Sequence, residues 1–321
     1  MLKSLKYAVL LCLLSSCSLS YKIADQKSTR VLKREHLVYH SLDSEKYNIT
    51  YWDSESNKPA LLLIHGFGTG GNFQWYKEAH ALSKNYRLII VNLLYFGSTA
   101  KIPSYSVDSQ VEAVQLLMKE LKIDSYDLCG SSYGGLVAAE LALKENKKIN
   151  KLILMDAPVK YLTHEDVDII RLKYHIDDQE NLLVPSSAKD LQRLMSISYK
   201  KKPKLPLRII RQFYNKNYVP NVKHLHEVYR NILLNDEFFQ KKDYKYSCPV
   251  LLVWGEDDEL VPLHIGYELQ KHIGNNSNFV LVPKAAHLPN LENKNYTNKL
   301  ILDFLMKDDS IQSAEADISK N

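Results

Sequence analysis

Along most of the chain, short apolar runs alternate with longer segments in which apolar residues recur every three or four positions. Short apolar runs bounded by turn formers are typical of strands, and the longer spacing is typical of amphipathic helices. Strands are expected at 46–52, 60–64, 87–91, 125–129, 151–155, 249–254 and 278–282, and helices at 73–83, 108–121, 133–144, 262–273 and 293–306. This alternation predicts an α/β fold with a mainly parallel central sheet and helices on both faces.

The alternation stops between residues 158 and 246, where the pattern predicts several helices broken by prolines. With 321 residues and 45% apolar content, the chain is long enough for one large core with an inserted subdomain. We therefore expect one core made of 31–157 and 247–307, the helical insertion 158–246, a linker at 17–30 and a disordered polar tail at 308–321.

The pentapeptide Gly130-Ser131-Ser132-Tyr133-Gly134 lies between an expected strand and an expected helix. A serine on such a sharp turn adopts a strained backbone, and the close approach of its neighbours explains a glycine two residues before and two residues after it. The turn exposes Ser132 Oγ above the sheet, and the N–H of Tyr133 points to where an oxyanion would form. An ordinary glycine-rich loop is the alternative, but the flanking elements favour a nucleophile elbow.

Two further candidates follow later strands. The apolar run 249–254 ends in Gly255-Glu256-Asp257-Asp258, and the run 278–282 is followed by a loop that contains His287. A histidine after the last strand is expected to be catalytic, although a surface loop histidine is the alternative.

With these marks the chain resembles the α/β-hydrolase family over about residues 30 to 307. The run 60–64 leads into His65-Gly66-Phe67-Gly68, which is similar to the family's oxyanion loop, and the stretch 92–99 departs from the family pattern by having Asn92 and Tyr95. The resemblance implies a Ser132, Asp258 and His287 triad, an oxyanion hole made by the N–H groups of Phe67 and Tyr133, and a cap formed by 158–246. Apolar residues of the cap are candidates for the pocket, but packing in the cap's own small core is the preferred explanation for any one of them, and none is assigned to binding: Tyr161, Ile169, Leu172, Phe213, Tyr229, Phe238 and Phe239.

In such a triad His287 takes the proton of Ser132 as general base and later returns it to the leaving group. Asp258 would fix the imidazole tautomer and stabilise the imidazolium. Asp257 and Asp156 are the other candidates for the acid; the family's spacing from Gly255 and to Pro262 favours Asp258. His65 is interpreted as a structural hydrogen-bonding residue.

The serine nucleophile disfavours the dehalogenase and epoxide hydrolase chemistries of similar folds, which use a carboxylate. We therefore expect a serine hydrolase of carboxylic esters, an esterase or lipase. A carbon–carbon bond hydrolase or an acyltransferase with the same triad, and a binding protein that has lost activity, are the alternatives.

The N-terminus predicts export. Two lysines, Lys3 and Lys6, precede an apolar stretch at 7–14 that is too short to span a bilayer, as in a signal peptide at 1–16. The segment Leu14-Ser15-Ser16-Cys17 resembles the bacterial lipobox, which implies lipidation of Cys17 and a place on a membrane of the bacterial cell envelope. Ordinary cleavage after Ser20 is the alternative.

Charge is uneven along the chain. Residues 158–246 carry a net charge of +6, and the rest of the chain carries −1. The basic stretch around Lys200–Lys204, with Arg208 and Arg211, could meet an anionic membrane, although a solvated surface is the ordinary and preferred explanation. No nucleic-acid-binding motif accompanies the charge, and no pattern specifies an oligomeric state.

Cysteine usage predicts no chemistry. Cys129 and Cys248 are expected at opposite ends of strands two places apart, beyond disulfide reach, so two free thiols are predicted. No Cys/His spacing suggests zinc, and neither a metal nor a cofactor is expected.

Overall fold

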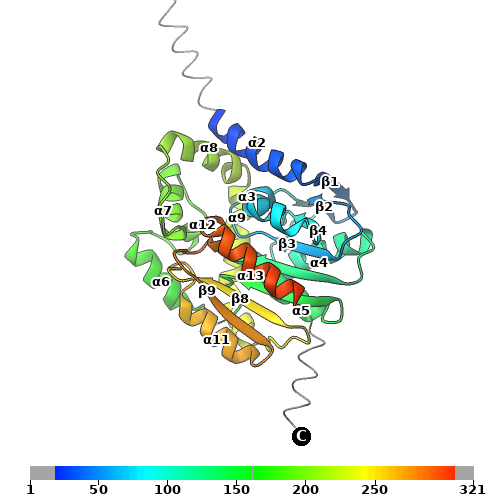
Figure 1. Ribbon diagram of the computed structural model, residues 1–321. Coiled ribbons are helices and arrows are strands. Elements are labelled where there is room, and N and C mark those ends of the chain that lie inside the picture. The colour runs from blue at the N-terminus through cyan, green and yellow to red at the C-terminus, as the bar shows by residue number, and fades with distance from the viewer. Residues whose placement is uncertain (1–18, 161, 308–321) are drawn as a thin grey trace, which may run out of the picture.

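The computed structural model describes residues 19–160 and 162–307. Their sheet has nine strands in the order β1-β2-β4-β3-β6-β7-β8-β9, with β5 paired to β2 (Figure 1). The strands are β1 (Val38–Asp43), β2 (Tyr47–Asp53), β3 (Ala60–Ile64), β4 (Arg87–Val91), β5 (Thr99–Ala100), β6 (Tyr126–Ser131), β7 (Ile149–Met155), β8 (Val250–Gly255) and β9 (Ser277–Val282). The strands β4, β3, β6, β7, β8 and β9 run parallel, and β1, β2 and β5 are antiparallel additions. The predicted α/β fold with a mainly parallel sheet is confirmed.

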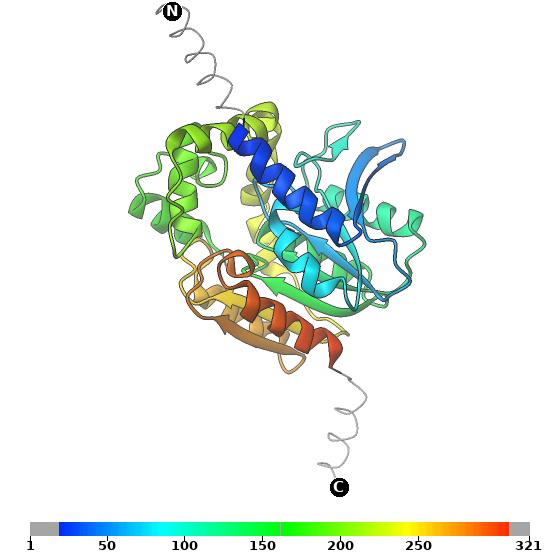
Figure 2. The same cartoon turned by 45° about the horizontal axis from the view of Figure 1, so that its top comes forward.

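Helices cover both faces of this sheet, as Figures 1 and 2 show. One face packs against α2 (Leu19–Arg34), α3 (Gly71–Leu82) and α13 (Lys294–Met306), and the other packs against α4 (Val107–Glu120), α5 (Tyr133–Lys144) and α11 (Leu263–Ile273). Strand residues alternate between these two cores: Leu61 and Leu63 join the first, whereas Leu62 and Ile64 join the second. Because both faces are buried, the central strands are continuous apolar runs.

The insertion folds into helices above the carboxyl edge of the sheet. It contains α6 (His164–Lys173), α7 (Ala188–Ser198), α8 (Leu207–Asn217), α9 (Val222–Leu234) and α10 (Asp236–Lys241), with short 3-10 turns η1 (Glu180–Leu182) and η2 (Val219–Asn221). The short helix α12 (Pro289–Glu292) follows the last strand. None of the helices among the described residues is long and apolar enough to cross a bilayer.

The N-terminal segment differs from its prediction. Residues 19–30, expected to belong to a linker, are part of helix α2, which packs on α3 and α8 and buries Ser28 and Leu32. The sequence did not indicate this helix because only a narrow stripe of α2 is apolar. Its stability comes from tertiary contacts rather than from a strong amphipathic pattern. The expected signal peptide, Cys17 and the expected tail at 308–321 lie outside the described residues.

The antiparallel strands β1 and β5 were not predicted, because β1 lies at the sheet edge with most of its residues exposed and β5 is two residues long. Cys129 and Cys248, the two cysteines in the described part of the chain, are buried and free, as predicted.

Candidate active site

Ser132 occupies the turn between β6 and α5 in a strained conformation. Its φ is 53° and its ψ is −124°, a region that costs a non-glycine residue free energy. A Cβ on Gly130 would lie 2.3 Å from the Gly134 carbonyl oxygen, and one on Gly134 would lie 2.3 Å from the His65 carbonyl oxygen. Strand, turn and helix therefore pack so closely that both positions require glycine.

Three side chains from separate loops form a continuous hydrogen-bonded line. His287 Nε2 lies 2.8 Å from Ser132 Oγ, and His287 Nδ1 lies 2.8 Å from Asp258 Oδ2. All three residues are buried, with exposures of 8% for Ser132, 6% for Asp258 and 4% for His287. Because an ionised carboxylate only accepts hydrogen bonds, Nδ1 carries the proton and Nε2 is the base that faces the serine hydroxyl.

The backbone orients the Asp258 carboxylate. Its Oδ1 accepts hydrogen bonds from the N–H groups of Leu260 at 2.8 Å and Val261 at 3.1 Å, which leaves Oδ2 for His287. The adjacent Asp257 instead forms an ion pair with Lys200 of the cap. Of the three carboxylates weighed from the sequence, Asp258 is the one that contacts the imidazole.

Asp156 lies just behind this pair. Its Oδ1 accepts a hydrogen bond of 2.8 Å from the Gly255 N–H, and it belongs to a group with Asp258 and His287 whose nearest oxygen and nitrogen atoms lie within 4.8 Å of one another. Complete burial, and then the charge of Asp258, raise the pKa of Asp156 well above its ordinary value. We therefore expect Asp156 to be neutral.

Two backbone N–H groups flank the serine. Phe67 follows Gly66, where a Cβ would lie only 3.2 Å from Ser132 Cβ, and Tyr133 is the first residue of α5. Within the described chain, neither N–H donates to another backbone carbonyl. Both donors are thus free to bind an oxyanion next to Ser132, where the N-terminal dipole of α5 also favours negative charge.

His65 holds the loop that carries Phe67. Its Nε2 accepts a hydrogen bond of 3.0 Å from the Leu93 N–H, so Nδ1 carries the proton and donates to the Gly66 carbonyl oxygen at 2.7 Å. Burial lowers the pKa of His65 to about 4, which keeps the ring neutral at physiological pH. This supports the interpretation of His65 as a structural residue.

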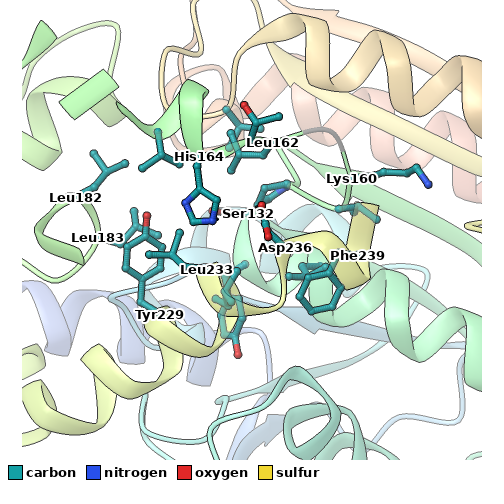
Figure 3. A pocket seen from close by; sticks show the side chains of 18 of the residues that line it. Ser132, Lys160, Leu162, His164, Leu182, Leu183, Tyr229, Leu233, Asp236 and Phe239 are labelled. Carbon is teal, nitrogen blue, oxygen red and sulfur yellow. Dashed lines mark ion pairs between the residues drawn. The ribbon is translucent and has the colours of Figure 1, made fainter. Parts of the chain in front are cut away.

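Two cavities meet at Ser132. The larger, of about 450 Å³, runs from Ser132 and His287 past the oxyanion loop to α2, α7 and α8. The smaller, of about 80 Å³, lies on the Tyr133 side, where Tyr229, Leu233 and Phe239 of the cap gather around Ser132 (Figure 3). Both have mainly apolar walls, so one could hold an acyl chain while the other holds the leaving group.

The cap candidates divide between these cavities and the surface. Phe213 lines the larger cavity, and Tyr229 and Phe239 line the smaller one. Three others, Ile169, Leu172 and Phe238, are more than half exposed, and Tyr161 is outside the described residues. A separate small core forms around Val167 and Ile170 of the cap and includes Leu260 of the loop after β8. Helical periodicity could not distinguish these fates, because each depends on how the cap sits on the core.

A buried polar network beneath the site was not indicated by the sequence. Asn290 donates to Glu78 Oε2 at 3.2 Å and to the Gln74 carbonyl oxygen at 2.9 Å, and the Gln74 amide donates to Asn290 at 3.2 Å. Complete burial raises the pKa of Glu78 to about 8. The network joins α3 to the segment that follows His287. Its sequence signal was weak: two polar residues, Gln74 and Glu78, four positions apart in an otherwise partly apolar helix.

The model of one family, described as the alpha/beta hydrolase fold, matches residues 59–294. Among curated relatives, epoxide hydrolase 3 of Xenopus tropicalis is 25% identical over 79% of this chain and 73% of its own. The 2-hydroxy-6-oxononadienedioate/2-hydroxy-6-oxononatrienedioate hydrolase of Burkholderia vietnamiensis is 24% identical over 83% of this chain and 93% of its own. The monoacylglycerol lipase ABHD6 of Homo sapiens is 25% identical over 78% of this chain and 76% of its own.

Among solved structures, a membrane phospholipase A described as a bacterial virulence factor aligns with a TM-score of 0.75 at 23% identity, covering 95% of this chain and 98% of the other. A structural similarity at 23% sequence identity supports the fold alone. The family match spans most of the residues that form the sheet, the cap and the Ser132 site. The chain therefore belongs to the α/β hydrolase fold family.

Proposed function

We propose that the protein is a serine hydrolase that cleaves carboxylic esters, with lipid esters as its substrate class. The observation that carries this proposal is the line from Ser132 through His287 to Asp258, with both links at 2.8 Å and two free backbone donors beside the serine. Nucleophile, base, orienting acid and oxyanion donors are the four parts that acyl transfer needs.

In the first half of the reaction Ser132 Oγ attacks the ester carbonyl carbon while its proton passes to His287 Nε2. Negative charge moves to the carbonyl oxygen, where the N–H groups of Phe67 and Tyr133 stabilise it; one such donor is worth about 3 kcal/mol in other hydrolases. Asp258 stabilises the imidazolium. The bond to the leaving alcohol then breaks, His287 returns the proton to the alcohol oxygen, and an acyl-serine ester remains.

The second half repeats these steps with water. His287 takes a proton from a water molecule whose oxygen attacks the acyl carbon, and the same two N–H groups hold the second oxyanion. As this intermediate collapses, the proton returns from His287 to Ser132 Oγ and the carboxylic acid leaves. Each residue thereby regains its starting protonation state.

The cavities support a lipid ester. The larger one is in the size range of small-molecule sites, is mainly apolar, and is continuous with Ser132. Relatives named as a monoacylglycerol lipase and as a membrane phospholipase A lend further support. A carbon–carbon bond hydrolase is the second candidate, favoured by the relative that carries that name. The similarity to an epoxide hydrolase gives little support for epoxide hydrolysis, because that reaction uses a carboxylate nucleophile and the nucleophile position here is a serine.

We also propose that Cys17 is lipidated and anchors the enzyme to a membrane of the bacterial cell envelope. The support is the lipobox-like sequence directly after a short apolar stretch. Cells expressing the parent chain and a Cys17→Ser variant would be labelled with palmitate and fractionated. Label on the parent alone supports the proposal, whereas equal label on both, or none, contradicts it.

The test of the catalytic proposal is hydrolysis of p-nitrophenyl esters from acetyl to palmitoyl by the parent chain and its Ser132→Ala variant. Activity in the parent that is lost in the variant is the expected result. Labelling of the parent by a fluorophosphonate without ester turnover would favour the carbon–carbon hydrolase or an acyltransferase. Neither labelling nor turnover would favour an inactive binding protein.

A further inference from the structure

Helix α2 presents a basic face to solvent. Its exposed residues lie within an arc of about 140° when projected at 100° per residue. They are Lys22, Ile23, Gln26, Lys27, Arg30, Lys33 and Arg34. Five of the seven are cations, and Ile23 adds an apolar side chain that is 53% exposed. A cluster of lysines and arginines on an exposed helix surface is attracted to the anionic headgroups of a membrane.

Helix α8 and the loop before it continue this basic surface. The cations of α8 are all exposed, namely Arg208, Arg211 and Lys216, and residues 199–206 contribute four exposed lysines. The start of α2 is fixed to α8, because the Tyr21 N–H donates to Gln212 at 3.0 Å and the Tyr21 ring packs on Phe213 at 5.0 Å. Figures 1 and 2 show α2 and α8 side by side.

Among the described residues, ion pairs neutralise little of the charge of this surface. Together α2, residues 199–206 and α8 carry twelve cations and one acid, a net charge of +11, whereas the whole chain carries +5. In the described part of the chain, Lys200 is the member of this set with an ion pair, to Asp257. A solvated face usually mixes both signs, so an excess confined to three adjoining segments indicates an anionic partner.

The mouth of the larger cavity opens within this basic surface. Its lining includes Ala24 and Lys27 of α2, Pro203 and Leu205 of the loop, and Phe213 of α8. Lys27 is exposed, whereas Ser132 and His287 at the inner end are buried, so the cavity leads from the basic surface to the nucleophile.

We propose that α2, residues 199–206 and α8 form a docking face for an anionic lipid bilayer and hold the cavity mouth against it. We infer a bilayer rather than a protein as the partner because the cations are spread over helix surfaces, with an exposed Ile23 among them, and because the cavity reaches the edge of this face at Lys27. Docking lets an ester pass from the membrane to Ser132 without crossing water. This last step rests on the proposed ester hydrolysis, whereas the docking itself does not.

Binding is measured with a chain that begins at Leu19, which keeps every described element and lacks Cys17. A Ser132→Ala background prevents lipid turnover. Vesicles of phosphatidylcholine alone are compared with vesicles of phosphatidylcholine and phosphatidylglycerol in equal parts, at low and high salt. One variant replaces α2 cations by Gln (Lys22, Arg30 and Lys33), a second replaces those of α8 (Arg208, Arg211 and Lys216), and a control replaces exposed lysines elsewhere (Lys119, Lys122 and Lys147).

The chain is expected to bind the anionic vesicles alone, and less at high salt. Each test variant should lower the partition coefficient by on the order of a hundredfold, as expected for three cations near an anionic surface, while the control stays near the parent. Equal binding to both vesicle types, or equal losses in the test and control variants, would overturn the proposal.

A second arm separates docking from catalysis. With Ser132 restored, the α8 variant should hydrolyse a short soluble ester as the parent does, but should lose turnover of an ester embedded in anionic vesicles. An α8 variant that binds vesicles weakly while vesicle turnover is unchanged would also contradict the proposal. If the parent hydrolyses no ester but still binds anionic vesicles, the docking face stands and the proposed hydrolysis fails.

Discussion

The carboxyl edge of the sheet and the cap face each other across Ser132, but they are stabilised in different ways. At the edge, Ser132, Asp258 and His287 are buried and joined by hydrogen bonds, and the backbone is strained at Ser132 and at Asp156, whose φ is 46°. In the cap, a small apolar core supports helices whose other apolar residues line cavities or meet solvent.

This difference separates chemistry from recognition. At the edge, a line of hydrogen bonds holds Ser132, His287 and Asp258 in place, so a small displacement there is costly. The cap presents apolar side chains whose shape matters more than their identity, so its residues can change without moving the reacting atoms. Substitutions at the edge should therefore lower kcat, and substitutions in the cap should change substrate preference.

The largest effect on kcat is expected at the carboxyl edge, where two buried carboxylates, Asp258 and Asp156, can be substituted and compared. Asp258→Asn removes the charge that fixes the His287 tautomer, and kcat should fall by about 10⁴-fold, as for the equivalent change in other serine hydrolases. Asp156→Asn replaces a neutral acid by a neutral amide and should leave kcat within about tenfold. Steady-state ester hydrolysis checks both. The reverse order of effects would make Asp156 the acid of the triad.

A smaller loss is expected where the edge touches the cap. A Cβ at Gly68, whose φ is 89°, would lie 2.1 Å from the Tyr218 hydroxyl, so Gly68→Ala should displace the loop that carries Phe67 and lower kcat/KM by about a hundredfold. Gly274→Ala is the matched control, because φ there is 85° but no atom lies within 4 Å. Both variants should lose about 1–3 kcal/mol of stability from backbone strain, measured by urea unfolding. Equal activity losses would show that strain alone is responsible.

Substitutions in the cap should change the preference for ester chain length rather than the overall rate. Met195→Trp on α7 narrows the larger cavity, and we expect kcat/KM to fall about tenfold for long-chain esters and little for acetyl esters. Ile169→Trp, at an exposed cap position, is the control and should not alter the chain-length profile. A uniform decrease for all esters in Met195→Trp would indicate that the cavity does not hold the acyl chain.

The smallest effect on activity is expected from substitution of Glu78, which lies beneath the carboxyl edge of the sheet. Its pKa is raised to about 8, so the folded protein binds a proton there that the unfolded chain releases above about pH 4.5. The free energy of unfolding should therefore fall as pH rises from about 4.5 to 8, by up to about 1.4 kcal/mol per pH unit. Glu78→Gln should remove this slope and leave kcat within about twofold.

The shifted pKa of His65 makes the free energy of unfolding depend on pH in the opposite direction, and over a lower pH range. Its pKa is lowered to about 4, so its contribution to stability is lost as pH falls from about 6.5 to 4. Urea unfolding of the parent and of Glu78→Gln between about pH 7 and 8 therefore isolates the Glu78 effect. Parallel pH profiles for the two proteins in that window would contradict the assignment of a proton to Glu78.

Much of the core could be predicted from the sequence. The expected helix at 133–144 coincides with α5, and the central strands are within one or two residues of their observed bounds, because both faces of those strands are buried and their apolar runs are continuous. Edge strand β1 and helix α2 were missed, since their stability depends on neighbours rather than on their own pattern. The Gln74, Glu78 and Asn290 network was missed for the same reason.

The sequence by itself determined the sharp turn at Ser132, because close backbone contacts permit only glycine at 130 and 134, and it determined the α/β alternation through the periods of its strands and helices. Only the tertiary structure decided that Asp258 rather than Asp156 faces His287, which cap residues line a cavity, and that α2 borders the cavity mouth. Such pairings depend on how strands, loops and helices distant in the chain are brought together, and local sterics and periodicity do not encode those distances.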